Sequence, residues 1–172
     1  MQELVKLQRD VDAILVPFGN MVQLNKDTEV TITQSLGGSY TIVNSGAMYR
    51  VDSKDADSLG KVATDFVNVK NQEATLDEQI WNILRTCYDP EIPVNIVDLG
   101  LIYDVKVIDN NVIVYLTLTA PGCGMGPIIA QDAKQKILYL PGVSSAEIEF
   151  VFDPPWDRSM MSDQAKLELG LF

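Results

Sequence analysis

The first third of the chain contains short runs that predict strands, and the run 29–34 alternates polar and apolar side chains as a strand with one buried face does. These runs occupy residues 12–16, 29–34, 40–43 and 47–51. Glycine-containing turns at 36–39 and 44–46 separate the later runs, and glycine supplies the positive φ that tight hairpins need. The polar stretch 55–60 predicts a turn or a short helical segment. We therefore expect a small, β-rich, barrel-like domain over residues 1–70.

A polar segment at 68–75 predicts a linker, and a helix begins at its end. Thr75 precedes Glu78 by three positions, which is the spacing of a capping box. Apolar residues with helical spacing follow, and Pro90 disfavours helical geometry in the residue before it, so this helix should end near Tyr88.

The pattern of residues 75–172 predicts a two-layer domain. Strands are expected at 101–108, 112–118 and 146–152, and helices at 128–140, opened by Pro127, and after the cap at Ser162. The order α-β-β-α-β predicts an α+β domain with a mixed three-stranded sheet, because the helical crossover makes its two strands parallel.

The composition excludes several kinds of chemistry. The chain has no histidine, which removes the most common general base and metal ligand. Its two cysteines, Cys87 and Cys123, cannot supply the four thiolates of a zinc or iron–sulfur cage within one chain. The net charge of −11 disfavours nucleic-acid binding. The sequence contains no run of about 20 apolar residues and no secretory signal pattern, so a cytoplasmic location is expected.

The glycine-rich segment 117–127 carries the strongest chemical signal. Cys123 lies between Gly122 and Gly124, after a strand and before a helix, with Thr119 earlier in the same loop. A helix N-terminus favours a thiolate over a thiol, and glycines let a ligand approach the backbone closely. The alternative is that Cys123 is a small apolar residue in a tight turn.

Other candidates flank this cysteine in sequence. Asp89, Glu91 and Asp98 lie on a proline-stiffened loop, where carboxylates can bind iron or orient a neighbour. The alternative, which we favour for each carboxylate taken alone, is a structural role, with Asp89 and Asp98 capping turns by accepting backbone N–H groups. Cys87, at a helix end, is expected to pack in the core, with metal binding as the less favoured alternative.

Three motifs together resemble the PaaD-like family of metal–sulfur cluster biosynthesis proteins. They are Asp-Pro-Glu-Ile-Pro-Val-x-Ile-Val-Asp-Leu-Gly-Leu-Ile at 89–102, Thr-x-Pro-Gly-Cys at 119–123 and Pro-Pro-Trp…Met-Ser at 154–162. Segments 32–41 and 55–60 resemble the N-terminal extension of the SufT branch. The resemblance implies a bacterial maturation factor that delivers iron–sulfur clusters to apo-proteins, with Cys123 as the reactive cysteine and an acidic loop of Asp89, Glu91 and Asp98.

The resemblance also implies partners and a mode of action. Scaffold or carrier proteins, a P-loop carrier ATPase and apo-protein clients are expected, and a homodimer sharing iron or a cluster through Cys123 is consistent with the small number of thiolates. We expect an assembly factor and not an enzyme. Two alternatives stay open: an adaptor that binds targets through Trp156 and the acidic surface, and a thiol-dependent redox enzyme, which the absence of histidine disfavours.

Overall fold

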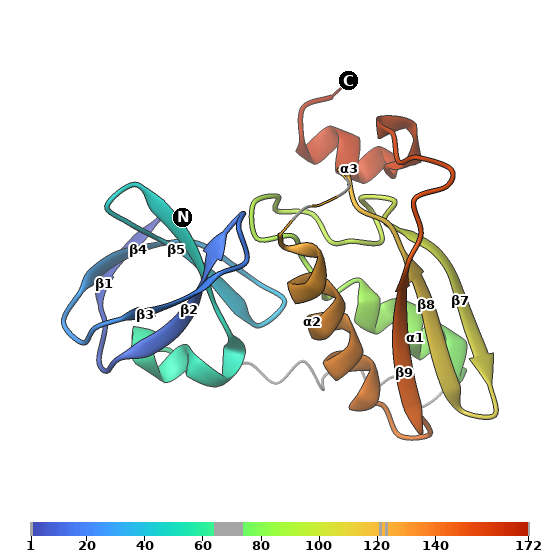
Figure 1. Cartoon of the computed structure of the whole chain (residues 1–172), viewed down its shortest axis with the longest axis horizontal. Helices are drawn as coiled ribbons and strands as arrows, with labels where there is room; N and C mark the ends of the chain where they lie inside the picture. The colour runs from blue at the N-terminus through green and yellow to red at the C-terminus, as the bar shows by residue number, and fades with distance from the viewer. Residues whose placement is uncertain (1, 64–73, 121, 123, 172) are drawn as a thin grey trace. The chain divides into compact units, whose positions relative to one another are not determined.

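The protein is an α+β chain of two compact units, Met1–Phe66 and Val67–Phe172, as expected for its fold class. The computed structural model describes residues 2–63, 74–120, 122 and 124–171 (Figure 1). In this part of the chain no helix is long and apolar enough to cross a membrane.

In the first unit, six antiparallel strands form one sheet in the order β1-β4-β5-β6-β2-β3. The strands are β1 (Glu3–Lys6), β2 (Val11–Val16), β3 (Met21–Leu24), β4 (Glu29–Leu36), β5 (Ser39–Asn44) and β6 (Ala47–Val51). The sequence pattern did not predict β1 or β3, because each has only four residues and neither shows a clear alternation. The polar stretch after β6 forms the 3-10 helix η1 (Ser53–Leu59).

The core of this unit follows the period of two that predicts the strands. Val30 and Ile32 of β4 are buried and pack with Ile42 of β5 and with Ala56 and Leu59 of η1. The expected barrel-like closure is not confirmed. Within residues 2–63 no strand pairing joins β1 to β3, so the sheet has two unpaired edges there.

The second unit has the predicted order α-β-β-α-β and a mixed three-stranded sheet. Its elements are α1 (Leu76–Leu84), β7 (Ile102–Ile108), β8 (Asn111–Leu116), α2 (Gly126–Leu138), β9 (Ser145–Phe150), the 3-10 helix η3 (Arg158–Met160) and α3 (Asp163–Glu168). β7 pairs with β8 antiparallel and β8 with β9 parallel, as predicted. α2 packs against both α1 and β9.

Helix α1 begins as the sequence predicts and ends earlier. The side chain of Thr75 accepts from the backbone N–H of Glu78, and the Glu78 carboxylate accepts from the backbone N–H of Thr75, which completes the capping box. The helix ends at Leu84 and not near Tyr88. Beyond Leu84 the backbone N–H groups of Thr86 and Cys87 donate three residues back, to Ile83 and Leu84, and the Thr86 hydroxyl also donates to the carbonyl of Ile83 at 2.6 Å, so the α-helical pattern stops there.

Strand direction brings three connecting segments to one edge of this sheet. The loop 87–101 leads into β7, the connection 117–125 leaves β8, and the tail 151–162 leaves β9. Since β7 runs opposite to β8 and β9, its amino end lies beside their carboxyl ends. These are the segments that carry the sequence motifs, and Figure 1 shows their described parts at the same end of the sheet.

Candidate functional site

The connection between β8 and α2 contains the predicted cysteine motif. Cys123 itself lies outside the described residues, so its prediction as the functional residue is not tested by the geometry. Among the predicted supporting residues, Gly122 and Thr119 are exposed and Gly124 is half-buried. Gly122 has φ = 81°, a left-handed conformation that glycine adopts without strain.

The base of this connection is tightly packed. A Cβ on Gly126, the first residue of α2, would lie 2.7 Å from Cδ1 of Leu118 and 3.6 Å from Cε1 of Phe150. Glycine at position 126 therefore lets the helix start against the ends of β8 and β9. Among the described residues no side chain caps α2, whose N-cap residue is Met125, and Pro127 occupies its first turn. The first backbone N–H groups of the helix have no intrahelical partner, and they carry the positive end of the helix dipole.

Asp89 uses its carboxylate to shape the start of the acidic loop. Its Oδ1 accepts from the backbone N–H of Glu91 at 2.8 Å, and its carbonyl accepts from Ile92 at 3.3 Å. Burial raises the pKa of Asp89, because a desolvated carboxylate loses hydration, and the backbone hydrogen bonds only partly oppose this. Glu91 is exposed. The turn-forming role weighed from the sequence is therefore present at Asp89.

Asp98 belongs to a second turn of the same loop. Asn95 donates from Nδ2 to Oδ2 of Asp98 at 2.6 Å, and Oδ1 of Asn95 accepts from the backbone N–H groups of Val97 and Asp98. This is an Asx turn, which fixes the backbone just before β7. The carboxylate of Asp98 is half-buried and held by Asn95, so the loop presents it in one orientation.

The tail after β9 closes over the end of the acidic loop. The indole Nε1 of Trp156 donates to the carbonyl of Leu99 at 2.8 Å, and the backbone N–H of Ser162 donates to the carbonyl of Asp98 at 2.8 Å. Tyr103 donates from its hydroxyl to the carbonyl of Pro154 at 2.6 Å. We call residues 153–162 the latch. The indole of Trp156 therefore binds within its own unit.

Cys87 lies in the interior of the second unit. It is fully buried, its thiol lies 3.8 Å from the carbonyl of Ile83, and its own carbonyl accepts from the backbone N–H of Ile96 at 2.9 Å. Burial in this position supports core packing, while its metal role stays a prediction.

Two features near Cys87 were not predicted from the sequence. Lys136 of α2 is 1% exposed; its Nζ donates to the carbonyl of Thr86 at 2.7 Å and lies 3.2 Å from Oδ2 of Asp132. The spacing of four residues between Asp132 and Lys136 was the available signal. Burial raises the pKa of Tyr88, and the carboxylates of Glu168 and Asp98 act in the same direction.

The described side chains do not form a metal centre by themselves. Across residues 2–63, 74–120, 122 and 124–171, no group of three or more Cys, Asp or Glu side chains is placed to hold a metal ion. An iron or cluster cargo at the acidic loop would therefore need ligands from the cysteine connection, a second subunit or a partner.

Comparison with known proteins identifies the family. Residues 77–150 match the family of iron–sulfur cluster assembly proteins. An Fe-S protein maturation auxiliary factor of Porphyromonas gingivalis is 47% identical over 103 residues, which cover 59% of this chain and 98% of the relative. SufT of Staphylococcus aureus, also named an Fe-S protein maturation auxiliary factor, is 44% identical over 84 residues, 48% of this chain and 96% of that protein.

A solved structure agrees with these matches. The crystal structure of a domain of unknown function from Bacillus anthracis is 36% identical in sequence and has a TM-score of 0.53. The match covers 56% of this chain and 93% of the Bacillus anthracis chain. The chain belongs to the family of iron–sulfur cluster assembly proteins, which confirms the family expected from the motifs.

Proposed function

We propose that this protein is an accessory factor in iron–sulfur cluster assembly, which passes an iron or cluster cargo to apo-proteins through Cys123. The observation that carries the proposal is the convergence, at one sheet edge, of the connection containing Cys123, the acidic loop and the latch. The names of its relatives as maturation auxiliary factors support this role.

Each part of the edge has a role in this proposal. Cys123 would provide a thiolate to the cargo, favoured by the positive dipole at the N-terminus of α2, which begins three residues later. Asp98 and Glu91 would orient the cargo or supply oxygen ligands, and Asp89 would hold the loop. Because one chain has too few soft ligands, the cargo would be shared across a homodimer or with a partner.

The role is proposed as non-catalytic, with cytoplasmic scaffold proteins, a P-loop carrier ATPase and apo-protein clients as partners. Gly122, Gly124 and Thr119 would let these partners approach the thiolate closely, since Gly122 and Thr119 are exposed.

The experiment is anaerobic reconstitution with iron and sulfide, followed by transfer to an apo-ferredoxin. Wild type, Cys123→Ala and Cys87→Ala are compared by absorption and Mössbauer spectroscopy, with circular dichroism to check folding. We expect loss of cargo in the Cys123 variant alone, at about half a cluster per chain if two subunits share it. Equal binding and transfer by Cys123→Ala would refute the proposal.

An adaptor without cargo is the second candidate, and one observation favours it. The rings of Phe150 and Phe152 stack with centroids 6.4 Å apart and are 39% and 42% exposed, next to the start of α2. Cargo binding in none of the variants, together with client capture that Phe152→Ser abolishes, would support this candidate.

A further inference from the structure

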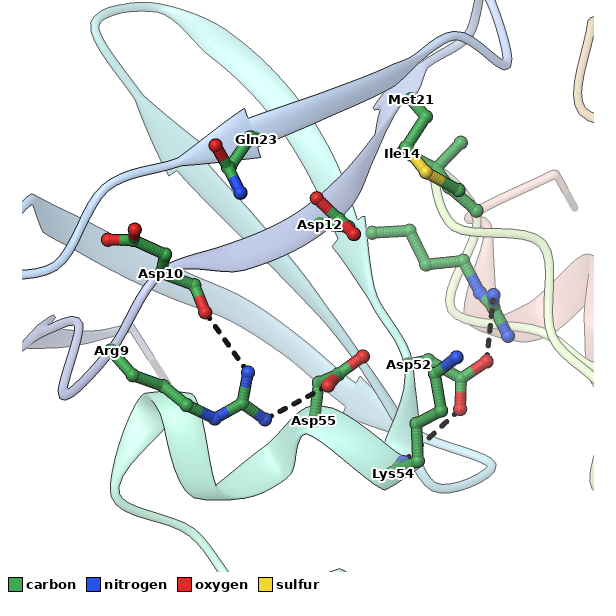
Figure 2. A pocket seen from close by; sticks show the side chains of 10 residues that line it. Arg9, Asp10, Asp12, Ile14, Met21, Gln23, Asp52, Lys54 and Asp55 are labelled. Carbon is green, nitrogen blue, oxygen red and sulfur yellow. Dashed lines mark hydrogen bonds and ion pairs between the residues drawn. The ribbon is translucent and has the colours of Figure 1, made fainter.

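The first unit contains a hollow of about 340 Å³ that lies outside the segment matched to the family. Strands β2, β3 and β6 line it together with the start of η1, and Figure 2 shows its side chains. The lining residues are Arg9, Asp10, Asp12, Ile14, Met21, Gln23, Arg50, Asp52, Lys54 and Asp55. Four carboxylates and three cations thus line the hollow, so the lining has a net negative charge.

Two of these cations are already close to carboxylates of the protein. Arg9 donates to Asp57 at 2.6 Å and to Asp55 at 2.9 Å, and the hydrogen bond to Asp57 is the main cause of the raised pKa of Arg9. Arg50 lies 3.9 Å from Asp52. The third cation, Lys54, makes no ion pair with Asp12 among the described residues, so the local cations leave Asp12 available to an incoming group.

Asp12 and Gln23 form the polar end of the hollow. They are directly opposite each other in the β2–β3 pairing, and Figure 2 shows both side chains facing the hollow. Neither side chain makes a hydrogen bond or ion pair within the described residues. A free carboxylate next to an amide carbonyl is suited to a guanidinium or ammonium group, which brings several N–H donors.

The neighbouring cross-strand pair is apolar. Ile14 and Met21 are opposite each other two positions along the same strands, and Met21 is 71% exposed. Side chains of one face recur every second residue, so the hollow presents a polar pair and then an apolar pair along β3.

β3 is also an edge of the sheet, and no strand of residues 2–63 pairs with its outer side. It ends the strand order and consists of Met21, Val22, Gln23 and Leu24, none of them charged. At the opposite edge, β1 carries Glu3, which pairs with Lys61 at 2.7 Å, and Lys6, 3.8 Å from Glu29. Charged residues discourage strand addition, so β3 is the edge open to an added strand.

We propose that the β3 edge and its hollow bind an extended segment of a partner protein that carries a basic side chain two positions from an apolar one. The segment would add as a strand beside β3, with its main chain giving affinity and the two side chains giving specificity. The basic side chain would lie at Asp12 and Gln23 and the apolar one at Ile14 and Met21. The net charge of −11 of the chain favours such a cationic partner.

The test titrates the full chain with a synthetic peptide, acetyl-Val-Thr-Arg-Thr-Leu-Thr-Val-amide, and follows backbone amides by NMR. If the peptide pairs antiparallel with β3, its arginine lies beside Gln23 and its leucine beside Met21. A second peptide, with the arginine and leucine exchanged, places the same side chains there if it pairs parallel. We expect shifts at β3 for one of the two, and none for versions with glutamate replacing arginine.

Three variants decide whether the hollow is responsible. Asp12→Asn should weaken binding by about 2- to 5-fold, and Gln23→Glu should strengthen it by a similar factor. Asp109→Asn, an equal charge change on an exposed turn of the second unit, should leave it unchanged. Absence of shifts at millimolar peptide, shifts at β1, or equal binding by the glutamate peptides would overturn the proposal. The test involves no cluster, so its result is separate from that of the reconstitution.

Discussion

The indole N–H of Trp156 donates to the carbonyl of Leu99 at 2.8 Å, joining residues that are 57 positions apart. This bond closes the latch over the acidic loop, and the same loop carries Asp89, Glu91 and Asp98.

Trp156→Phe keeps an aromatic ring and removes the donor. The carbonyl of Leu99 then lacks its partner, so we expect a loss of about 1 kcal/mol in the free energy of unfolding. Urea denaturation measures it, and hydrogen exchange should quicken at residues 98–101. Trp81→Phe is the control, since no hydrogen bond involves the Trp81 indole among the described residues. Unchanged exchange in the latch variant would contradict the prediction.

Gly100→Ala should detach the latch by steric conflict. A Cβ at this position would overlap the Met160 carbonyl group, with its carbon 2.7 Å away, and the glycine has φ = 75°. Gly142 has a similar φ of 91° and no atom within 4 Å, so Gly142→Ala carries the backbone strain alone. We expect Gly100→Ala to be about 1–3 kcal/mol more destabilising than this control in denaturant titration. Equal losses would mean that the backbone at Met160 moves away freely.

Lys136→Met tests the buried ammonium group. The substitution keeps the length of the side chain and removes the donor to Thr86, leaving the Asp132 carboxylate without this cation. We expect a loss of about 1–3 kcal/mol in the free energy of unfolding. Lys134→Met, on an exposed position of the same helix, should change it by less than about 0.5 kcal/mol. If Lys136→Met left the free energy of unfolding unchanged, the hydrogen bond and ion pair of Lys136 would contribute no net stability.

The raised pKa of Asp89 makes the free energy of unfolding depend on pH. Its pKa is raised in the folded protein above the ordinary 3.8, so the unfolded chain loses this proton first as the pH rises. The free energy of unfolding therefore falls between the ordinary pKa and the raised one, and this penalty persists at higher pH. Asp89→Asn removes this penalty and keeps an oxygen atom that accepts from the backbone N–H of Glu91.

We expect Asp89→Asn to gain stability relative to wild type as the pH increases from about 3 to about 7. Denaturant titrations at several pH values measure the difference. Glu91→Gln, an equal charge change on an exposed neighbour, is the control. A relative loss of stability over this range would show that ionised Asp89 is stabilised in the fold.

Local signals in the sequence predicted the elements well where they were strong. The capping box of Thr75 and Glu78 formed as expected, and the order of elements predicted the mixed sheet. β1 and β3 were missed because four-residue strands give too few positions to reveal alternation. Helix α1 was predicted too long because the side-chain turn at Thr86 precedes the proline signal.

The candidate site was predictable only in part. Strand directions bring the motif segments to one edge, which follows from the order of elements. The bond from Trp156 to Leu99 and the burial of Lys136 depend on contacts between distant segments, and lysine on a helix normally faces solvent. The spacing of Asp132 and Lys136 signals an ion pair on the helix. It does not show that Lys136 is buried, and no local pattern shows where the indole of Trp156 binds.

The latch moves the C-terminal boundary of the second unit beyond the segment that matches the family. The family match ends at residue 150, where the last strand also ends, yet the residues that fasten the acidic loop come after it. A gene fusion that joined residues 75–150 to another protein would keep all three strands and leave the carbonyls of Asp98 and Leu99 without donors. By these hydrogen bonds the structural unit extends through Ser162, twelve residues beyond the end of the family match.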